Sequence, residues 1–266
     1  MKIALVDSGI GLLAAAAAVR RLRPDATLVL SGDPDGMPWG PRSPEDITAR
    51  AVRCARAAAA ERPDALIVAC NTASVHALPA LRAELEPRIP VIGTVPAVKP
   101  AAAAGGPLAI WATPATTGSP YQRRLIEDFA SGAPTAEVPC HGLAAAVERA
   151  DGTAVALAVK AAAALTPAGT RELVLGCTHY ELVAARIREQ LGTVTLRPVT
   201  LRGSAEAVAA QALRRIGAAP APDAPSTGGL VTLAGGLPGT LPEAVLAYAE
   251  GRLLLPGSPA PSTAGG

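Results

Sequence analysis

The 266-residue sequence has little of several residue types that mark particular functional classes. Aromatic residues make up only 2% of it, which argues against a surface that stacks nucleic-acid bases. The formal net charge is +2, from 24 basic and 22 acidic residues, so there is no basic excess of the kind that nucleic-acid binding requires. We therefore expect no nucleic-acid partner.

Long apolar segments are also missing. The Ala-rich run from Leu12 to Val19 is too short for a membrane span and is followed by Arg20, Arg21 and Arg23, a pattern typical of an amphipathic helix. Residues 1–7 enter a strand directly, without the apolar region and cleavage site of a signal peptide. We therefore expect a soluble, cytoplasmic protein with no membrane partner.

Cysteine is scarce and irregularly spaced. The four cysteines are Cys54, Cys70, Cys140 and Cys177. This spacing fits neither a zinc site nor the disulfide framework of a small secreted domain. We therefore expect neither a metal site nor a disulfide framework.

The most informative stretch is residues 64–74. Its short aliphatic run predicts a strand that is buried on both faces, as in a parallel sheet. The run is followed by Cys70, Asn71 and Thr72, at the carboxyl end of the strand, where open α/β sheets bind small molecules. The same residues also fit a structural role, as a buried cysteine followed by an Asn/Thr cap of the next helix.

The same pattern occurs a second time in residues 172–180, where an apolar run again ends in a cysteine, Cys177. Cys70 follows Asp7, and Cys177 follows Thr113, at intervals that differ by one residue, and both Asp7 and Thr113 come at the end of a predicted strand. We infer two similar α/β lobes with mainly parallel sheets, related by a pseudo-two-fold axis, with the active site in the cleft between them.

Strand and helix patterns alternate along the rest of the chain. We predict strands at 3–6, 27–30, 91–93, 107–113, 136–139 and 230–234, and helices at 12–22, 75–85, 121–129, 154–165, 182–191, 205–216 and 242–253. Asp7 and Ser8 could cap the helix at 12–22. We assign residues 1–97 plus 208–255 to the first lobe, 98–207 to the second, and 256–266 to a disordered tail.

Two thiols that face each other suit the inversion of a carbon centre. One thiolate, Cys70 or Cys177, removes a proton from one face while the other thiol delivers a proton to the opposite face. An ordinary thiol has a pKa of about 8.5, so the base needs assistance, for which Asp7 and His179 are candidates. Donors for the charge of the carbanion could come from Ser8, Asn71, Thr72 and Thr178.

Lysine occurs only as Lys2, Lys99 and Lys160. Amino-acid carbanions are usually stabilised by pyridoxal phosphate bound to a lysine. None of the three lysines is close in sequence to a Gly-rich phosphate loop. This favours chemistry that needs no cofactor.

Four motifs together resemble the glutamate racemases of the aspartate/glutamate racemase family. They are Asp7-Ser8-Gly9, Pro38-Trp39-Gly40, the segment 69–74 around Cys70 and the segment 176–180 around Cys177. The similarity runs from about residue 3 to residue 253. It implies a two-lobed, pyridoxal-free isomerase that interconverts L- and D-glutamate for peptidoglycan precursors, commonly as a homodimer.

The resemblance also implies roles for individual residues. Cys70 and Cys177 would be the two catalytic bases, supported by Asp7, Glu148 and His179. The substrate would be bound by Asp7, Ser8, Trp39, Gly40, Asn71, Thr72, Thr113, Thr116, Thr178 and His179.

The sequence departs from the family at several positions. Trp39 stands where Tyr is usual, Leu12 stands where Gly is usual, and the loop after Asp33 differs. These changes bear on the substrate more than on the fold. Two alternatives stay open: a racemase of the same superfamily that acts on aspartate or a hydantoin, and a catalytically weak binding or regulatory relative.

Overall fold

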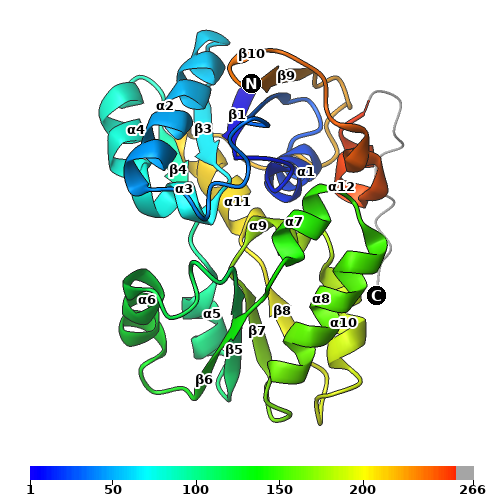
Figure 1. Cartoon of the computed structure of the whole chain (residues 1–266). Coiled ribbons are helices and arrows are strands. Elements are labelled where there is room, and N and C mark those ends of the chain that lie inside the picture. Colours follow the sequence, from blue (N-terminus) through cyan, green and yellow to red (C-terminus); the bar gives the residue numbers. More distant parts are fainter. Residues whose placement is uncertain (256–266) are drawn as a thin grey trace.

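The computed structural model describes residues 1–255, and the predicted tail at 256–266 lies outside them. Two sheets form the centres of two α/β lobes (Figure 1). In spatial order, the upper sheet consists of β10 (Leu237–Pro238), β9 (Leu230–Ala234), β2 (Thr27–Gly32), β1 (Lys2–Val6), β3 (Ala65–Val68) and β4 (Val91–Gly93). The lower sheet consists of β6 (Thr135–Pro139), β5 (Leu108–Ala112), β7 (Glu172–Leu175) and β8 (Thr200–Arg202). All described strand pairs are parallel except β10 with β9, which confirms the predicted α/β fold.

The two sheets share one strand order. The run β2-β1-β3-β4 in the first lobe corresponds to β6-β5-β7-β8 in the second. The strands β3 and β7 therefore hold equivalent places, and each precedes one of the two cysteine motifs. Because the carboxyl ends of parallel strands lie at one edge of a sheet, each lobe presents its cysteine at that edge.

Helices cover both sheets. Those of the first lobe are α1 (Leu12–Leu22), α2 (Pro44–Ala60), α3 (Asn71–His76), α4 (Leu78–Leu85), α11 (Ala205–Arg215), the short 3-10 helix η1 (Glu243–Ala247) and α12 (Ala249–Leu253). Those of the second lobe are α5 (Val98–Ala103), α6 (Pro120–Ala130), α7 (Leu143–Glu148), α8 (Gly152–Leu165), α9 (Thr178–Glu181) and α10 (Ala184–Leu191). In Figure 1, α7 and α9 lie at the junction of the lobes.

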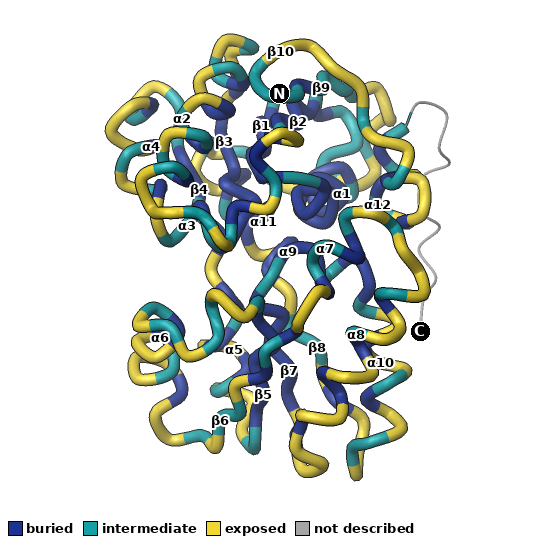
Figure 2. Tube along the Cα trace, in the orientation of Figure 1, coloured by how far each residue is buried: buried dark blue, intermediate teal, exposed yellow. Residues whose placement is uncertain are grey.

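Strand β1 is buried on both of its faces (Figure 2). Ile3 and Leu5 pack in one apolar cluster with α1, whereas Ala4 and Val6 pack in another with α2. Successive side chains of a strand point to opposite faces, so a strand covered on both faces needs apolar residues at every position. This explains why the strands read as continuous apolar runs.

Helix α1 joins the cores of the two lobes. Leu12 to Arg20 are all buried, and the apolar cluster that contains them continues into α7 and α9 of the second lobe. A helix that is covered on all sides has to be apolar all round. The Ala-rich composition of α1 reflects this position and lets neighbouring elements approach closely.

The helices after the two cysteines begin earlier than predicted. The first starts at Asn71 rather than near Val75 and divides at Ala77, because Pro79 has no N–H to continue the helical hydrogen bonds. The second starts at Thr178 rather than at Leu182 and divides before α10. The polar residues after each cysteine therefore belong to the first turn of a short helix.

Other local predictions were also wrong. Asp7 and Ser8 do not cap α1, whose N-cap is Gly11 without a side-chain hydrogen bond. The last predicted helix is interrupted at Tyr248, whose backbone is extended. The short strands β8 and β10 were not predicted, since three and two residues carry too little pattern to read.

The final segment of the chain returns to the first sheet. Strand β9 pairs in parallel with β2, with Leu230 opposite Leu28. We propose residues 1–97 plus 208–255 as the first lobe and 98–207 as the second, with the first turn of α11 at the boundary.

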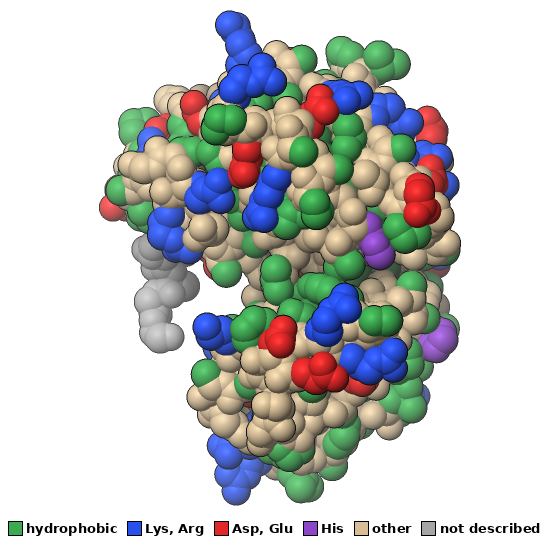
Figure 3. Space-filling view, turned by 90° about the vertical axis from the view of Figure 1, so that its left-hand side faces the viewer, with side chains coloured by type: hydrophobic (Ala, Val, Ile, Leu, Met, Phe, Trp, Pro, Cys, Tyr) green, Lys and Arg blue, Asp and Glu red, His purple; other side chains and the backbone are tan. Residues whose placement is uncertain are grey.

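On the face in Figure 3, basic and acidic side chains are interspersed, and the outline narrows between the lobes.

Candidate active site

The strand ends of both lobes open onto one cavity of about 370 Å³. All residues predicted for the site line it except Glu148. They are Asp7, Ser8, Trp39, Gly40, Cys70, Asn71 and Thr72 from the first lobe, and Thr113, Thr116, Cys177, Thr178 and His179 from the second. The volume lies within the usual range for small-molecule sites.

Cys70 and Cys177 have nearly the same backbone conformation. Cys70 has φ −141° and ψ 122°, and Cys177 has φ −142° and ψ 134°. The preceding amides, of Ala69 and Gly176, donate hydrogen bonds to the ends of β1 and β5 at 2.8 and 2.7 Å. A Cβ at Gly176 would lie 2.8 Å from the carbonyl oxygen of Trp111, so only glycine allows this close approach.

On the first-lobe side, the partner of Cys70 is Asp7, which is completely buried. Oδ1 of Asp7 accepts a hydrogen bond from the amide of Ser8 at 2.6 Å, whereas Oδ2 has no hydrogen-bond partner among residues 1–255. Burial raises the pKa of Asp7 to about 6, against the opposing charge of His179. Burial, and next the charge of Asp7, raise the pKa of Cys70 well above its ordinary value. Cys70 is therefore held as a neutral thiol beside a carboxyl group that titrates near neutral pH.

On the second-lobe side, Cys177 is followed by a chain of two further groups. Its Sγ lies 3.9 Å from Nδ1 of His179, and Nε2 of His179 lies 2.8 Å from Oε2 of Glu148. Burial alone would lower the pKa of His179, but hydrogen bonds with Cys177 and Glu148 raise it well above its ordinary value. The sulfur of Cys177 therefore lies beside an imidazolium that is paired with a carboxylate.

Glu148 lies behind His179 rather than in the cavity wall. It is the last residue of α7, and its Oε2 also accepts a hydrogen bond from the amide of Ile10 at 2.9 Å. A Cβ at Gly9 would overlap its carboxylate, so a side chain at position 9 would have to move Glu148 away from its present place. Any action of Glu148 on a ligand has to pass through His179.

A direct hydrogen bond links the two cysteine motifs. Nδ2 of Asn71 donates to the carbonyl oxygen of Gly176 at 2.6 Å, while Oδ1 of Asn71 has no partner among residues 1–255. The amide group predicted to bind a ligand is therefore partly used to hold the lobes together. On the second-lobe wall, the hydroxyls of Thr113 and Thr116 lie 3.2 Å apart and contact each other.

Charged groups are few in the cavity wall. Among the described lining residues, Asp7 and His179 are the only ionisable groups other than the thiols, and none is Lys or Arg. The remaining polar groups are hydroxyls, an amide and backbone N–H groups. An anionic ligand would therefore be bound by neutral donors and by one imidazolium.

Several lining residues were not predicted from the sequence. They include Met37 and Pro41 of the loop after β2, and Cys140, Ala144 and Ala145 after β6. Cys140 follows β6 as Asp33 follows β2, so applying the strand-end rule to β6 would have found it. Burial raises the pKa of the Cys140 thiol well above its ordinary value.

Glu181, which does not line the cavity, was also not predicted from the sequence. It ends the short helix that carries His179, and its carboxylate accepts hydrogen bonds from N and Oγ of Ser204 and from N of Ala205, at 2.8, 2.7 and 3.2 Å. Ser204 makes no side-chain cap of its own at the start of α11. Glu181 therefore supplies the helix cap where the chain passes from β8 towards the first lobe.

Comparison with known proteins shows the family. The profile of the family described as Asp/Glu/Hydantoin racemase matches residues 12–218. The chain belongs to this racemase family. It is 39% identical to the glutamate racemase of Roseiflexus sp. (strain RS-1) over 199 residues, which are 73% of each chain. It is 37% identical to the glutamate racemase of Pseudomonas putida (strain KT2440) over 221 residues, which are 81% of this chain and 82% of the relative.

A solved racemase structure has the same fold. The structure of Escherichia coli glutamate racemase in complex with L-glutamate and the activator UDP-MurNAc-ala matches with a TM-score of 0.75 and 26% identity. The match covers 92% of this chain and 91% of that one. The expected family resemblance and two-lobed racemase fold are thus confirmed. Within residues 1–255, no helix is both long and apolar enough to cross a membrane.

Proposed function

We propose that this chain interconverts L- and D-glutamate without a cofactor, with one of Cys70 and Cys177 removing the α-proton and the other donating a proton to the opposite face of Cα. The observation that carries the proposal is the pair of thiols in matching backbone positions at the walls of one cavity. Each thiol has a separate group beside it that can exchange protons, Asp7 on one side and His179 on the other. The glutamate racemases among its relatives support glutamate as the substrate.

In one direction, the thiolate of Cys177 takes the α-proton of the substrate. An S–H bond forms, the Cα–H bond breaks, and its electron pair moves into the α-carboxylate. The thiol of Cys70 then donates its proton to the opposite face of Cα and becomes a thiolate. The reverse direction exchanges the roles of Cys70 and Cys177, and the composition of the amino acid does not change.

The neighbouring groups exchange protons with the two sulfurs. His179, held by Glu148, lies beside the sulfur of Cys177, where it can accept or return a proton. Asp7 can accept the proton of Cys70 because its carboxylate is buried next to it and has one oxygen without a partner. After turnover, Asp7 and His179 transfer protons between the two sulfurs and water.

The cavity suits a small dicarboxylate that is bound mainly by neutral donors. Hydroxyl, amide and backbone N–H groups line both lobes, and such fixed donors stabilise the charge that develops on the α-carboxylate. The substrate ammonium has Asp7 as its acidic partner in the wall. The proposed binding residues are those predicted from the sequence, Asp7, Ser8, Trp39, Gly40, Asn71, Thr72, Thr113, Thr116, Thr178 and His179.

Three further proposals rest on the family resemblance. The D-glutamate would supply peptidoglycan precursors, the chain would form a homodimer, and it would act in the cytoplasm. Sedimentation equilibrium of the purified protein measures the oligomeric state directly, and a single species at the monomer mass of 26.6 kDa would contradict the dimer.

Polarimetry on a substrate panel tests the proposed function. The purified protein, with reduced thiols and no pyridoxal phosphate, is incubated separately with L-glutamate, D-glutamate, L-aspartate and a 5-substituted hydantoin. We expect loss of optical rotation with both glutamate enantiomers and much slower change with the others. Preferential turnover of aspartate or the hydantoin would replace glutamate as the substrate, and no turnover of any compound would favour a binding or regulatory role.

A further inference from the structure

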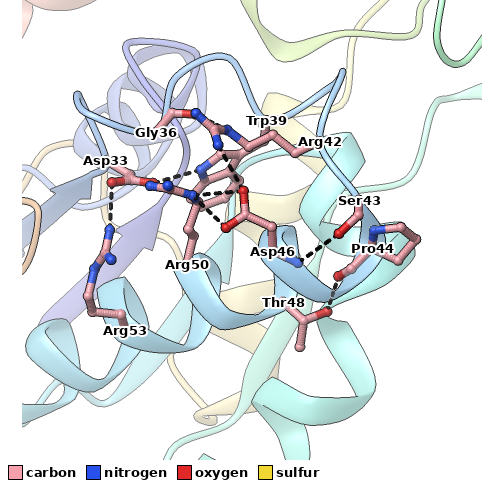
Figure 4. A network of polar contacts seen from close by, with 10 residues as sticks. All are labelled: Asp33, Gly36, Trp39, Arg42, Ser43, Pro44, Asp46, Thr48, Arg50 and Arg53. Carbon is pink, nitrogen blue, oxygen red and sulfur yellow. Dashed lines mark hydrogen bonds and ion pairs between the residues drawn. The ribbon is translucent and has the colours of Figure 1, made fainter.

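Asp33 is a completely buried carboxylate that has no part in the proposed reaction. It follows β2 and is the centre of a network of polar contacts (Figure 4). Its Oδ1 accepts a hydrogen bond from Arg53 at 2.7 Å, and its Oδ2 accepts from Arg50 at 3.1 Å and from Nε1 of Trp39 at 2.9 Å. Both arginines come from α2.

The backbone of Asp33 also shapes the loop that follows. Its carbonyl oxygen accepts hydrogen bonds from the amides of Gly36 and Met37, both at 3.0 Å, and its own amide donates to the carbonyl of Ser8 at 3.2 Å. A Cβ at Gly36 would overlap the carboxylate of Asp33 and the guanidinium of Arg50. A side chain at position 36 would therefore have to displace the carboxylate of Asp33 or the guanidinium of Arg50.

The same loop forms one wall of the cavity. Residues 37–41 all line it, and the side chain of Trp39 is only 1% exposed. Because the indole N–H donates to Asp33, Trp39 has no side-chain donor left for a ligand. Residues 37–41 then offer a ligand apolar side chains and backbone groups, such as the N–H of Gly40.

Among residues 1–255, no matching network is seen in the second lobe. The residue after β6, in the place of Asp33, is Cys140, whose Sγ donates only to the carbonyl of Val138, at 3.7 Å. Residues 37–41 of the first-lobe wall therefore depend on one buried carboxylate, whereas the segment after β6 lines the cavity with Cys140, Gly142, Ala144 and Ala145.

We propose that Asp33 is a positioning residue that fixes the wall at residues 37–41 through its hydrogen bond to Trp39 and so sets the affinity for the substrate. Arg50 and Arg53 hold the carboxyl group in place through ion pairs, and a buried carboxylate needs such partners because burying one without them is costly. Asp33 does not touch the substrate. The identity of the substrate rests on the proposed function, but the role of Asp33 in ordering the loop does not.

Kinetics of matched variants test the proposal. We expect Asp33→Asn and Trp39→Phe each to raise KM about 10-fold or more, with kcat changed about 3-fold or less, because a hydrogen bond to a charged group is lost outside the reacting centre. Asp35→Asn is the control, since Asp35 is an exposed carboxylate in the same loop. The double variant should be no worse than the more affected single variant, because both changes remove the same interaction.

Amide hydrogen exchange gives a readout that needs no substrate. Exchange at residues 36–42 should be faster in Asp33→Asn and Trp39→Phe than in the unchanged protein and in Asp35→Asn. Trp39→Phe leaves the ion pairs of Asp33 intact, so it keeps the test decisive if Asp33→Asn does not fold. Unchanged exchange in Trp39→Phe, or KM effects that multiply in the double variant, would overturn the proposal. If only the proposed function is wrong, the unchanged protein shows no turnover of glutamate, but exchange at residues 36–42 is still faster in the two variants than in the unchanged protein.

Discussion

The two walls of the cavity share a backbone design but differ in the groups that accompany the thiol. Cys70 and Cys177 follow equivalent strands with matching dihedral angles. Cys70 lies beside the buried carboxyl of Asp7, whereas Cys177 lies beside the His179–Glu148 pair. The carboxyl of Asp7 keeps Cys70 protonated, because burial and the charge of Asp7 raise the pKa of that thiol. Cys177 instead has a positively charged partner, His179, so the two sulfurs differ in the group that exchanges protons with them.

The largest expected effect comes from removing either thiol. Cys70→Ser and Cys177→Ser should each lower racemisation in both directions by about 10²–10⁴-fold, because a hydroxyl is a much weaker base than a thiolate. Polarimetry with L- and D-glutamate measures both directions. Cys54→Ser and Cys140→Ser are the controls and should retain activity, since Cys54 lies on the buried face of α2 and Cys140 has no assigned role in the reaction. An active Cys70→Ser or Cys177→Ser variant would show that one thiol is sufficient.

A smaller effect should come from Glu148→Gln, which keeps the shape of the His179 partner but removes its charge. We expect kcat to fall about 10–100-fold with little change in KM, because Glu148 acts through the imidazolium and lies outside the cavity wall. Because Glu148 raises the pKa of His179, its loss should lower that pKa and shift the pH dependence of kcat to lower pH. A change in KM alone would instead point to a direct role in binding.

On the first-lobe side of the site, the buried carboxyl of Asp7 predicts that Asp7→Asn gains stability and loses activity. The pKa of Asp7 is raised from 3.8 to about 6 in the folded protein, so ionisation of Asp7 opposes folding. The stabilisation from the protonated carboxyl of Asp7 is complete below about pH 4 and is lost as the pH rises through 6. The free energy of unfolding changes by about 3 kcal/mol over this range. Asp7→Asn, which is neutral at all pH values, should therefore be more stable than the unchanged protein at pH 8 but not at pH 4. Urea unfolding at the two pH values measures this, and equal differences at both would contradict it.

The same variant should lose the activity that needs Asp7 as a proton acceptor. In the unchanged protein, kcat/KM should fall as the pH decreases below about 6, where Asp7 becomes protonated. In Asp7→Asn this limb of the pH profile should be absent and the rate should be low throughout. A profile that keeps its limb near pH 6 would assign it to another group.

The smallest expected effect concerns the chain crossing between the lobes. Glu181→Ala should lower the free energy of unfolding by about 1–3 kcal/mol, because it leaves the amides of Ser204 and Ala205 without acceptors. Glu206→Gln in α11, the helix that Glu181 caps, is the control and should change stability by about 0.5 kcal/mol or less, since its pair with Arg21 is exposed. Equal urea midpoints for the two variants would show that the cap contributes little.

The sequence predicted the repeat because strands buried on both faces are visible as apolar runs, and because the residues after them are polar. This was sufficient to bring Asp7, Cys70, Thr113 and Cys177 to one cavity. It did not predict where the helices after the cysteines begin. Asn and Thr in those first turns read locally as caps or loops, and the tertiary structure overrode that preference.

Contacts between distant segments were the part that the sequence did not predict. The network of Asp33 with Arg50, the cap that Glu181 provides for α11, and the bond from Asn71 to Gly176 all join elements far apart in the chain. No local period or motif specifies such pairs. They become visible only once the strand order places the elements side by side.

The most direct test of the two-sided site is early deuterium incorporation during racemisation of L-glutamate in deuterated water. If separate thiols act on the two faces, the first D-glutamate formed carries deuterium at Cα while the remaining L-glutamate keeps its proton, as mass spectrometry of the separated enantiomers would show. If a single group serves both faces, the D-glutamate retains protium or the recovered L-glutamate gains deuterium as fast as product forms, and the proposed division between Cys70 and Cys177 is wrong.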